Sequence, residues 1–153
     1  GNARDLSRFP DCHFEAVYAS HVLEHFDYQG ELLQTLREWG RVLKPEGSLY
    51  VSVPDLAILC ELFLNRQQLN GKERFMVMRM MFGGHINEYD YHLVGLNVEF
   101  LASYLSRAGF VNARRVRSFQ LFSDTSEMVF KTVPISLNVI AQKPAAAATQ
   151  PNS

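Results

Sequence analysis

The sequence has few cysteines, no long apolar run and no secretory signal pattern. Its two cysteines, Cys12 and Cys60, lie far apart in unlike surroundings, which excludes a disulfide-rich scaffold and favours free thiols in a reducing compartment. No apolar run approaches the roughly 20 residues of a membrane span, and the N-terminal residues lack a basic segment followed by an apolar one. We therefore expect a cytoplasmic protein that does not contact a membrane.

Neither sign of charge dominates the chain. The 15 basic and 16 acidic residues give a net charge of −1, and they are interspersed apart from a short cluster of Arg114, Arg115 and Arg117. Nucleic-acid-binding surfaces are strongly basic, so no nucleic-acid partner is expected. The three arginines fall on a predicted strand, where they fit a charged, solvated sheet edge better than a phosphate site.

What the sequence does contain is enough apolar material for one globular domain. Of the 153 residues, 47% are hydrophobic and 20% are charged, which is the composition of a chain that buries a sizeable core. We assign residues 1–143 to this domain. The tail, residues 144–153, has no apolar periodicity and is predicted to be disordered.

Residues 14–54 predict a strand, a helix and a second strand. Residues 14–20 are rich in aromatic and β-branched side chains, which is typical of a central strand buried on both faces. Leucines and Trp39 recur at helical spacing over residues 29–42, and Pro45 and Gly47 end that helix. Residues 48–53 are again mostly apolar. Two such strands in one sheet are parallel and joined by a right-handed crossover.

The rest of the chain continues an α/β pattern. Asp55 precedes a predicted helix over residues 56–65, and Asn97 precedes another over residues 98–108 that ends at Gly109. Between them a helix over residues 71–81 carries crowded methionines, which are more often core filler than a binding surface. Two further strands are predicted at residues 111–119 and 135–142.

Four short runs, in this order and spacing, resemble the second half of small-molecule class I S-adenosylmethionine-dependent methyltransferases: FEAV at 14–17, HVLEH at 21–25, RVLKPEG at 41–47 and SVP at 52–54. Ala108, Gly109 and Phe110 fit the same pattern. The resemblance implies a Rossmann-like, mixed sheet with a C-terminal antiparallel hairpin. Residues 14–20 would be its fourth strand, so the N-terminal strands are missing, and with them the Gly-rich turn that approaches the cofactor.

The resemblance implies S-adenosylmethionine as the cofactor and assigns five residues to it. Asn2 and Ala3 look like the loop after the third strand, where an acceptor and a backbone amide meet the adenine ring. Ser20, His21 and Val22 match positions that line the methionine end. Their place agrees with the rule that ligands bind beyond the carboxyl ends of the strands in open α/β sheets.

Methyl transfer is an in-line displacement that depends mainly on positioning, but a hydroxyl or amine acceptor must also lose a proton. A histidine is the usual base. The resemblance favours His21, and His85 and His92 are further candidates. The alternative is that His21 packs in the groove and His25 braces the following helix.

The loop at residues 83–95 holds two histidines, two acids and two tyrosines, and loops of this density often carry function. These side chains can ring an acceptor pocket or bind a metal with His21. Alternatively, Ile86, Tyr89 and Tyr91 form a hydrophobic plug and the charged groups are solvated.

His21, Glu24 and His25 also match the H-x-x-E-H pattern, in which two histidines at helical spacing bind zinc and the glutamate is a base. That pattern sits within a helix, whereas here it directly follows a predicted strand. We therefore predict no metal site.

Two functions follow from these observations. The first is methyl transfer from S-adenosylmethionine to a small-molecule acceptor that the sequence does not identify. The second is a truncated or degenerate domain that serves as a non-catalytic assembly module. A fourth strand without its neighbours has an exposed edge that invites pairing with another chain, which predicts a homodimer.

Overall fold

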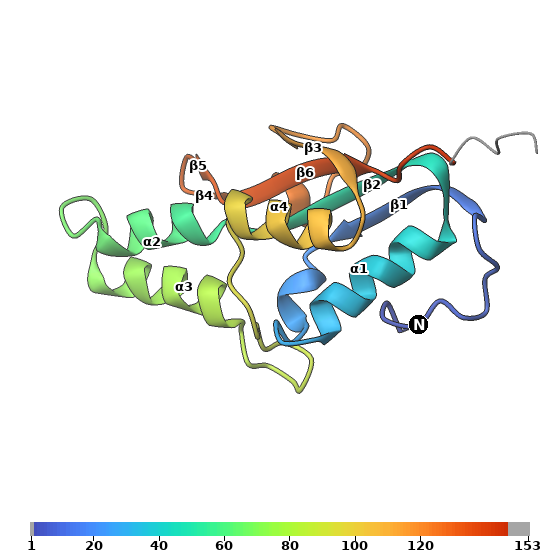
Figure 1. Cartoon of the computed structure of the whole chain (residues 1–153). Helices are drawn as coiled ribbons and strands as arrows, with labels where there is room; N and C mark the ends of the chain where they lie inside the picture. The colour runs from blue at the N-terminus through green and yellow to red at the C-terminus, as the bar shows by residue number, and fades with distance from the viewer. Residues whose placement is uncertain (1, 147–153) are drawn as a thin grey trace, which may run out of the picture.

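A four-stranded mixed sheet organises the chain (Figure 1). In the computed structural model, which describes residues 2–146, its strands lie in the order β1 (Phe14–Ser20), β2 (Leu43–Pro54), β6 (Ser136–Gln142) and β3 (Val111–Val116). β1 and β2 are parallel, whereas β6 is antiparallel to both β2 and β3. The predicted parallel crossover and the antiparallel closing pair are thus confirmed. Most of the predicted tail, residues 147–153, lies outside the described residues.

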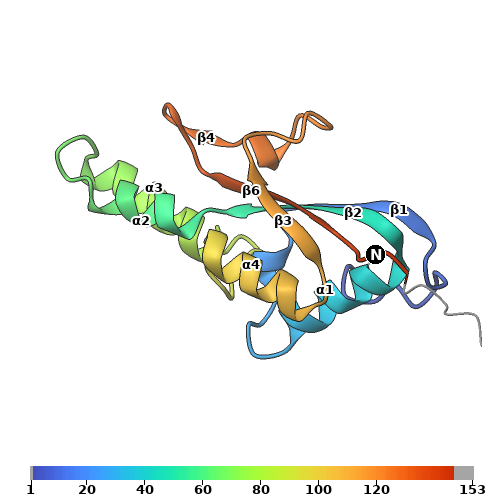
Figure 2. The same ribbon diagram turned by 45° about the horizontal axis from the view of Figure 1, so that its top comes forward.

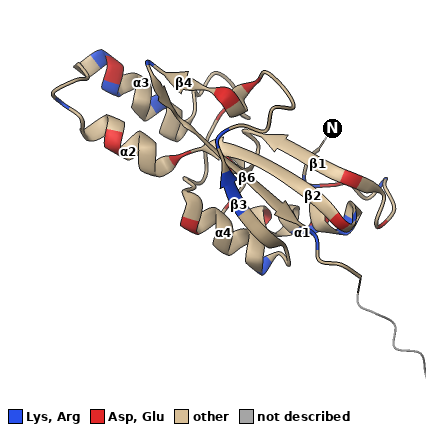
Figure 3. Ribbon diagram, turned by 90° about the horizontal axis from the view of Figure 1, so that it is seen from above, with Lys and Arg blue, Asp and Glu red and all other residues tan. Residues whose placement is uncertain are grey.

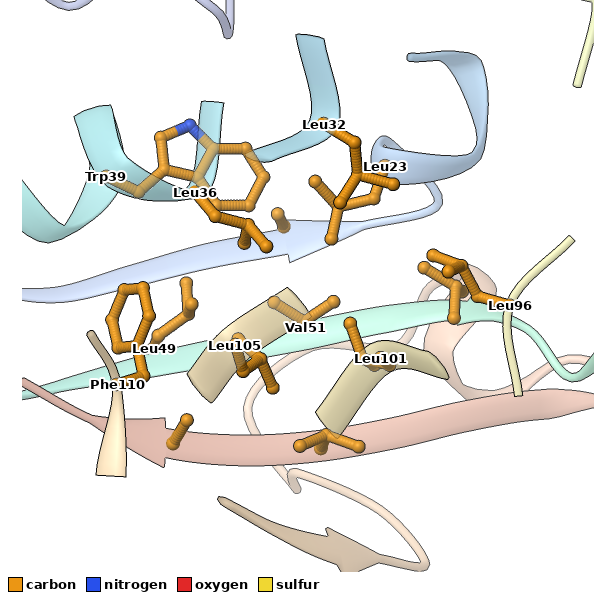
Figure 4. Close-up of a cluster of buried hydrophobic side chains, with 14 of the residues drawn as sticks. Leu23, Leu32, Leu36, Trp39, Leu49, Val51, Leu96, Leu101, Leu105 and Phe110 are labelled. Carbon is orange, nitrogen blue, oxygen red and sulfur yellow. The ribbon is translucent and has the colours of Figure 1, made fainter. Parts of the chain in front are cut away.

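Two helices cover one face of the sheet. They are α1 (Glu31–Val42) and α4 (Val98–Arg107), which lie side by side below the strands in Figure 2. Each buries the apolar stripe that its helical spacing predicts. Their side chains and those of β2 form the main core (Figure 4), which includes Leu32, Leu36, Trp39, Leu49, Val51, Leu101, Leu105 and Phe110.

The other two helices form a hairpin that extends away from the sheet (Figures 1 and 2). In it, α2 (Leu56–Leu64) packs against α3 (Gly71–Phe82). The hairpin has a small core of its own, made of Leu59, Leu62, Leu69 and Val77 from the hairpin and Ile135 from beside β6. The prediction that the methionines are core filler is only partly right. Met80 and Met81 pack against this core, but Met76 is 45% exposed.

β1 does not have the central, doubly buried place that its composition predicts. Within residues 2–146 it pairs only with β2, so it forms an edge of the sheet. Of its seven residues only Ala19 is buried. On the face without helices, Tyr18 contacts the rings of Phe119 and Phe122. Aromatic and β-branched residues favour strands at an edge as well as in the centre.

The remaining boundaries differ in detail. β2 starts at Leu43 rather than at residue 48, although its register against β1 is irregular over this part. β3 ends at Val116 rather than at residue 119. Four short elements were not predicted: η1 (Leu23–His25), η2 (Thr125–Glu127), β4 (Val129–Phe130) and β5 (Val133–Pro134). They are too short to show a periodic pattern.

Arg114 and Arg115 lie on β3 at the other edge of the sheet, as predicted, and are blue in Figure 3. Arg115 also has a structural partner, because its Nη2 donates to Oδ2 of Asp55 at 3.0 Å. Asp55 is buried, and its other oxygen accepts from the backbone N–H of Ala57 at 3.1 Å. The predicted helix cap at Asp55 is thus confirmed, and the cap is held by an ion pair.

The structure bears on two predictions about the environment of the chain. Cys12 and Cys60 are exposed free thiols, as expected. Among residues 2–146, no helix is both long enough and apolar enough to cross a membrane. The cytoplasmic location itself stays a prediction.

Candidate functional site

The site lies where the parallel strands β1 and β2 end. His21 directly follows β1 and has a positive φ of 52°, a left-handed conformation that is uncommon for a residue with a side chain. Its backbone N–H donates to the carbonyl of Ser52 at 2.8 Å. The chain then enters the short helix η1 (Leu23–His25), which turns Glu24 into the interior.

The ring of His21 has a defined tautomer. Its Nε2 lies 3.0 Å from Oγ of Ser136, and that hydroxyl donates to the carbonyl of Thr125 at 2.7 Å. A hydroxyl has only one hydrogen, and that of Ser136 is donated to Thr125. The proton in the hydrogen bond between His21 and Ser136 must therefore be on Nε2. The unprotonated Nδ1 then lies 3.6 Å from Oε1 of Glu24.

Glu24 is a buried carboxyl group without a hydrogen-bond partner. It is 1% exposed, and neither of its oxygens is hydrogen-bonded to any described residue. Burial raises the pKa of Glu24 to about 8. Burial, followed by the nearby His92, lowers the pKa of His21 to about 4. At neutral pH the two groups are therefore largely uncharged, and their 3.6 Å contact is not an ion pair.

The loop at residues 83–95 is tied to η1 through the backbone. The carbonyl of Glu24 accepts from the N–H groups of Leu93 at 2.7 Å and of Val94 at 3.3 Å. This brings His92 beside His25, with their ring centroids 5.0 Å apart. Burial, and then the charge of His25, lower the pKa of His92.

His25 also has a defined tautomer. Its Nδ1 lies 3.0 Å from the carbonyl oxygen of Tyr91, and a carbonyl can only accept. Nδ1 is therefore the donor, and the lone pair of Nε2 is free. One ligand atom from each of Glu24, His25 and His92 lies within 4.8 Å of the other two.

Two cavities meet at His21. The larger has a volume of about 840 Å³, and the smaller has a volume of about 310 Å³. His21 lines both. The larger is also lined by Asn2, Ala3, Val22, His25, Tyr89 and Tyr91, among others. The smaller is also lined by Met76, Arg79, Met80, Asp90, His92, Met128 and Ile135, among others.

Four of the five residues predicted to bind the cofactor thus share one cavity. Ser20 does not, because its hydroxyl lies 2.7 Å from Oγ1 of Thr125, away from the larger cavity. Of the three predicted bases, His21 and His92 share the smaller cavity. His85 lines neither cavity, since its Nε2 donates to the carbonyl of Phe82 at 2.8 Å and its ring stacks on Tyr91. Its catalytic role stays a prediction.

Glu24 is the site residue whose burial the sequence does not predict. The only signal is that it directly follows the apolar residues Val22 and Leu23. In the sequence it belongs only to the H-x-x-E-H pattern, which makes it a base. The structure confirms that this segment is no α-helix, since it forms the three-residue helix η1 directly after β1.

A comparison with family models gives one match, a methyltransferase domain, over residues 1–51. This range ends within β2 and contains Asn2, Ala3 and the turn around His21. No sequence among the curated proteins matches the chain.

Several solved structures share the fold. A "possible exported protein" from Bordetella parapertussis is 16% identical with a TM-score of 0.62, over 95% of this chain and 43% of that one. A SAM-dependent methyltransferase from Archaeoglobus fulgidus is 16% identical with a TM-score of 0.58, over 94% and 66%. One from Thermotoga maritima, a "possible histamine N-methyltransferase", is 19% identical with a TM-score of 0.57, over 94% and 62%. The chain therefore spans only part of each of them.

Proposed function

Because the chain has part of the fold of class I S-adenosylmethionine-dependent methyltransferases, we propose that it contributes to methyl transfer from S-adenosylmethionine to a small-molecule acceptor. The observation that carries the proposal is the position of His21, which lines two adjoining cavities. One of them holds four of the five residues assigned to the cofactor. The other has the apolar walls and few polar groups of a small-molecule site.

The larger cavity offers the residues assigned to the cofactor. Asn2, Ala3 and Val22 all line it. Oδ1 of Asn2 already accepts from the backbone N–H of Arg4 at 3.1 Å, but a carbonyl oxygen has a second lone pair. The Gly-rich turn that approaches the cofactor in the resembling family has no counterpart among the residues that line this cavity, because none of them is a glycine. The described chain therefore supplies only one wall of the proposed site. When bound, S-adenosylmethionine supplies an electrophilic methyl group.

The smaller cavity is suited to an apolar acceptor with one nucleophilic group. Met76, Met80 and Ile135 offer apolar contacts, and Arg79 and Asp90 offer charge. In the reaction a bond forms between the acceptor atom and the methyl carbon while the bond from sulfur to that carbon breaks. The acceptor's proton then needs a base. His21 is uncharged at neutral pH because burial holds its pKa at about 4, and it can accept this proton at Nδ1.

Titration of the chain with S-adenosylhomocysteine tests the cofactor site. We expect one-to-one binding by calorimetry. Val22→Trp fills the cavity and should weaken binding at least tenfold, which corresponds to about 1.4 kcal/mol. Ser20→Ala is the matched control, because its hydroxyl faces Thr125 and its loss should leave affinity unchanged. Equal effects of the two variants would contradict this site, and no binding at millimolar ligand would refute the cofactor proposal for this chain.

A specific observation favours the second function, a non-catalytic assembly module. Within residues 2–146 β1 has a partner on one side only, and its free edge can pair with another chain. We propose a homodimer that joins two β1 edges. Sedimentation equilibrium at micromolar concentration should then give twice the chain mass of 17.5 kDa, and a monomer throughout would rule the dimer out.

A further inference from the structure

Three side chains converge on one point beside the site and have no role in the function proposed above. They are Glu24 and His25 from η1 and His92 from the later loop, and their ligand atoms all lie within 4.8 Å of one another. We propose that these residues bind a divalent transition-metal ion such as Zn²⁺. This reverses the expectation from the sequence that the chain has no metal site.

The carboxyl group of Glu24 is the first independent support. It is 1% exposed, and both of its oxygens lack a hydrogen-bond partner. A buried polar group is costly unless it is hydrogen-bonded or bound to a metal. None of the described residues supplies a cation or a donor to it. A metal ion between Glu24, His25 and His92 satisfies these oxygens.

The tautomer of His25 is the second support. Its Nδ1–H donates to the carbonyl of Tyr91, which leaves the lone pair of Nε2 free to bind an ion. Histidine ligands in metal sites generally donate their other N–H to a carbonyl or carboxylate in this way, which fixes the ring and its tautomer. The polypeptide thus holds His25 in the form that binds metal.

His21 lies beside the three ligands but is not one of them. Its Nε2–H donates to Ser136, and its free Nδ1 lone pair lies 3.6 Å from Oε1 of Glu24. Two ligands at about 2.0 Å from a tetrahedral zinc ion lie about 3.3 Å apart, so the ligand atoms of Glu24, His25 and His92, which lie within 4.8 Å of one another, must move closer together to bind an ion. The fourth position on the ion stays open.

The ligand set selects the class of metal. Two imidazoles and one carboxylate favour Zn²⁺ and similar transition-metal ions, whereas Ca²⁺ and Mg²⁺ prefer oxygen ligands. The set also differs from the H-x-x-E-H pattern considered above. Glu24 is here a ligand rather than a base, and His92 comes from a distant part of the sequence.

The position of the site suggests what the ion does, and this step rests on the proposed function. His25 lines the larger cavity and His92 the smaller one, so the ion lies between them. A metal ion lowers the pKa of a bound hydroxyl. An acceptor hydroxyl that takes the open fourth position on the ion would bind as its anion, with its proton passing to the free Nδ1 of His21 beside Glu24.

Metal titration tests the site without cofactor or acceptor, so its outcome is independent of the methyl-transfer proposal. Tag-free full chain is freed of metal with a chelator and titrated with Zn²⁺ by calorimetry. We expect one-to-one binding. Co²⁺ should give the intense visible absorption of a four-coordinate ion. Zinc should also raise the melting temperature of the protein.

Variants locate the ion. Glu24→Gln keeps the shape of the side chain, and His92→Ala removes a ligand from the loop; each should weaken zinc binding at least tenfold and abolish the Co²⁺ absorption. His85→Ala is the matched control, because this histidine bonds to Phe82 outside the cluster, and its zinc affinity should be unchanged. Circular dichroism verifies that each variant is folded. No zinc binding by the original chain, or undiminished binding by Glu24→Gln, overturns the proposal.

Discussion

Replacing Gly83 by alanine is expected to lower the free energy of unfolding by about 3 kcal/mol. Gly83 ends α3 with φ 87° and ψ 166°, a region of backbone conformation that is almost restricted to glycine. A Cβ there would lie 2.2 Å from the carbonyl oxygen of Asp90 and 3.1 Å from the backbone nitrogen of His92. Both are backbone atoms, so the loop must move. Urea unfolding measures the loss.

Gly71→Ala is the matched control, because this glycine is at the start of α3 and an added Cβ has no neighbour within 4 Å. Alanine should stabilise this helix by up to about 1 kcal/mol. Because the shifted loop carries His92, Gly83→Ala should also weaken zinc binding while Gly71→Ala leaves it unchanged. If the two variants were equally stable, the tight contact between Gly83 and Asp90 would not exist in solution.

Glu24→Gln should raise the free energy of unfolding of the metal-free protein by about 1–3 kcal/mol at pH 8. The reason is that burial raises the pKa of Glu24 from its ordinary value of 4.5 to about 8 in the folded chain. The folded state binds this proton more tightly than the unfolded state, so the original chain loses stability as the pH rises from about 4.5 to 8. Glutamine resembles the protonated acid and avoids this loss.

The comparison should be made in the presence of a chelator at pH 4.5 and at pH 8. The two proteins should have nearly equal stability at the lower pH and diverge at the higher one. Glu99→Gln is the control, since Glu99 is exposed on α4 and its replacement should not change the pH dependence. A constant difference between Glu24→Gln and the original chain at both pH values would contradict the burial of an ionisable group. Saturating zinc should reverse the order of stability.

The elements with a strong periodic pattern could be predicted from the sequence. The bounds of β1 agree with the prediction, and α1, α2, α3 and α4 agree within two residues. The environment of β1 could not be predicted, because burial depends on which strands lie beside it. The segment between β3 and β6 was also missed, since two-residue strands carry no measurable periodicity.

The candidate site could be predicted only in part. Asn2, Ala3, His21 and Val22 were assigned by resemblance, and they do share a cavity. The approach of His92 to Glu24 could not be foreseen, because it depends on two backbone hydrogen bonds between distant segments. The tautomers of His21 and His25 could not be foreseen either, because they are set by a hydroxyl and a carbonyl elsewhere in the chain.

The helical hairpin has a consequence for how a molecule reaches the smaller cavity. Met76 and Met80 of α3 form one wall and His21 at the end of β1 forms another, yet the hairpin and the sheet are packed around separate cores. Units with separate cores can open one at a time. A molecule in this cavity therefore lies between two separately packed parts of the chain, so local opening of the hairpin would change the cavity without unfolding the sheet.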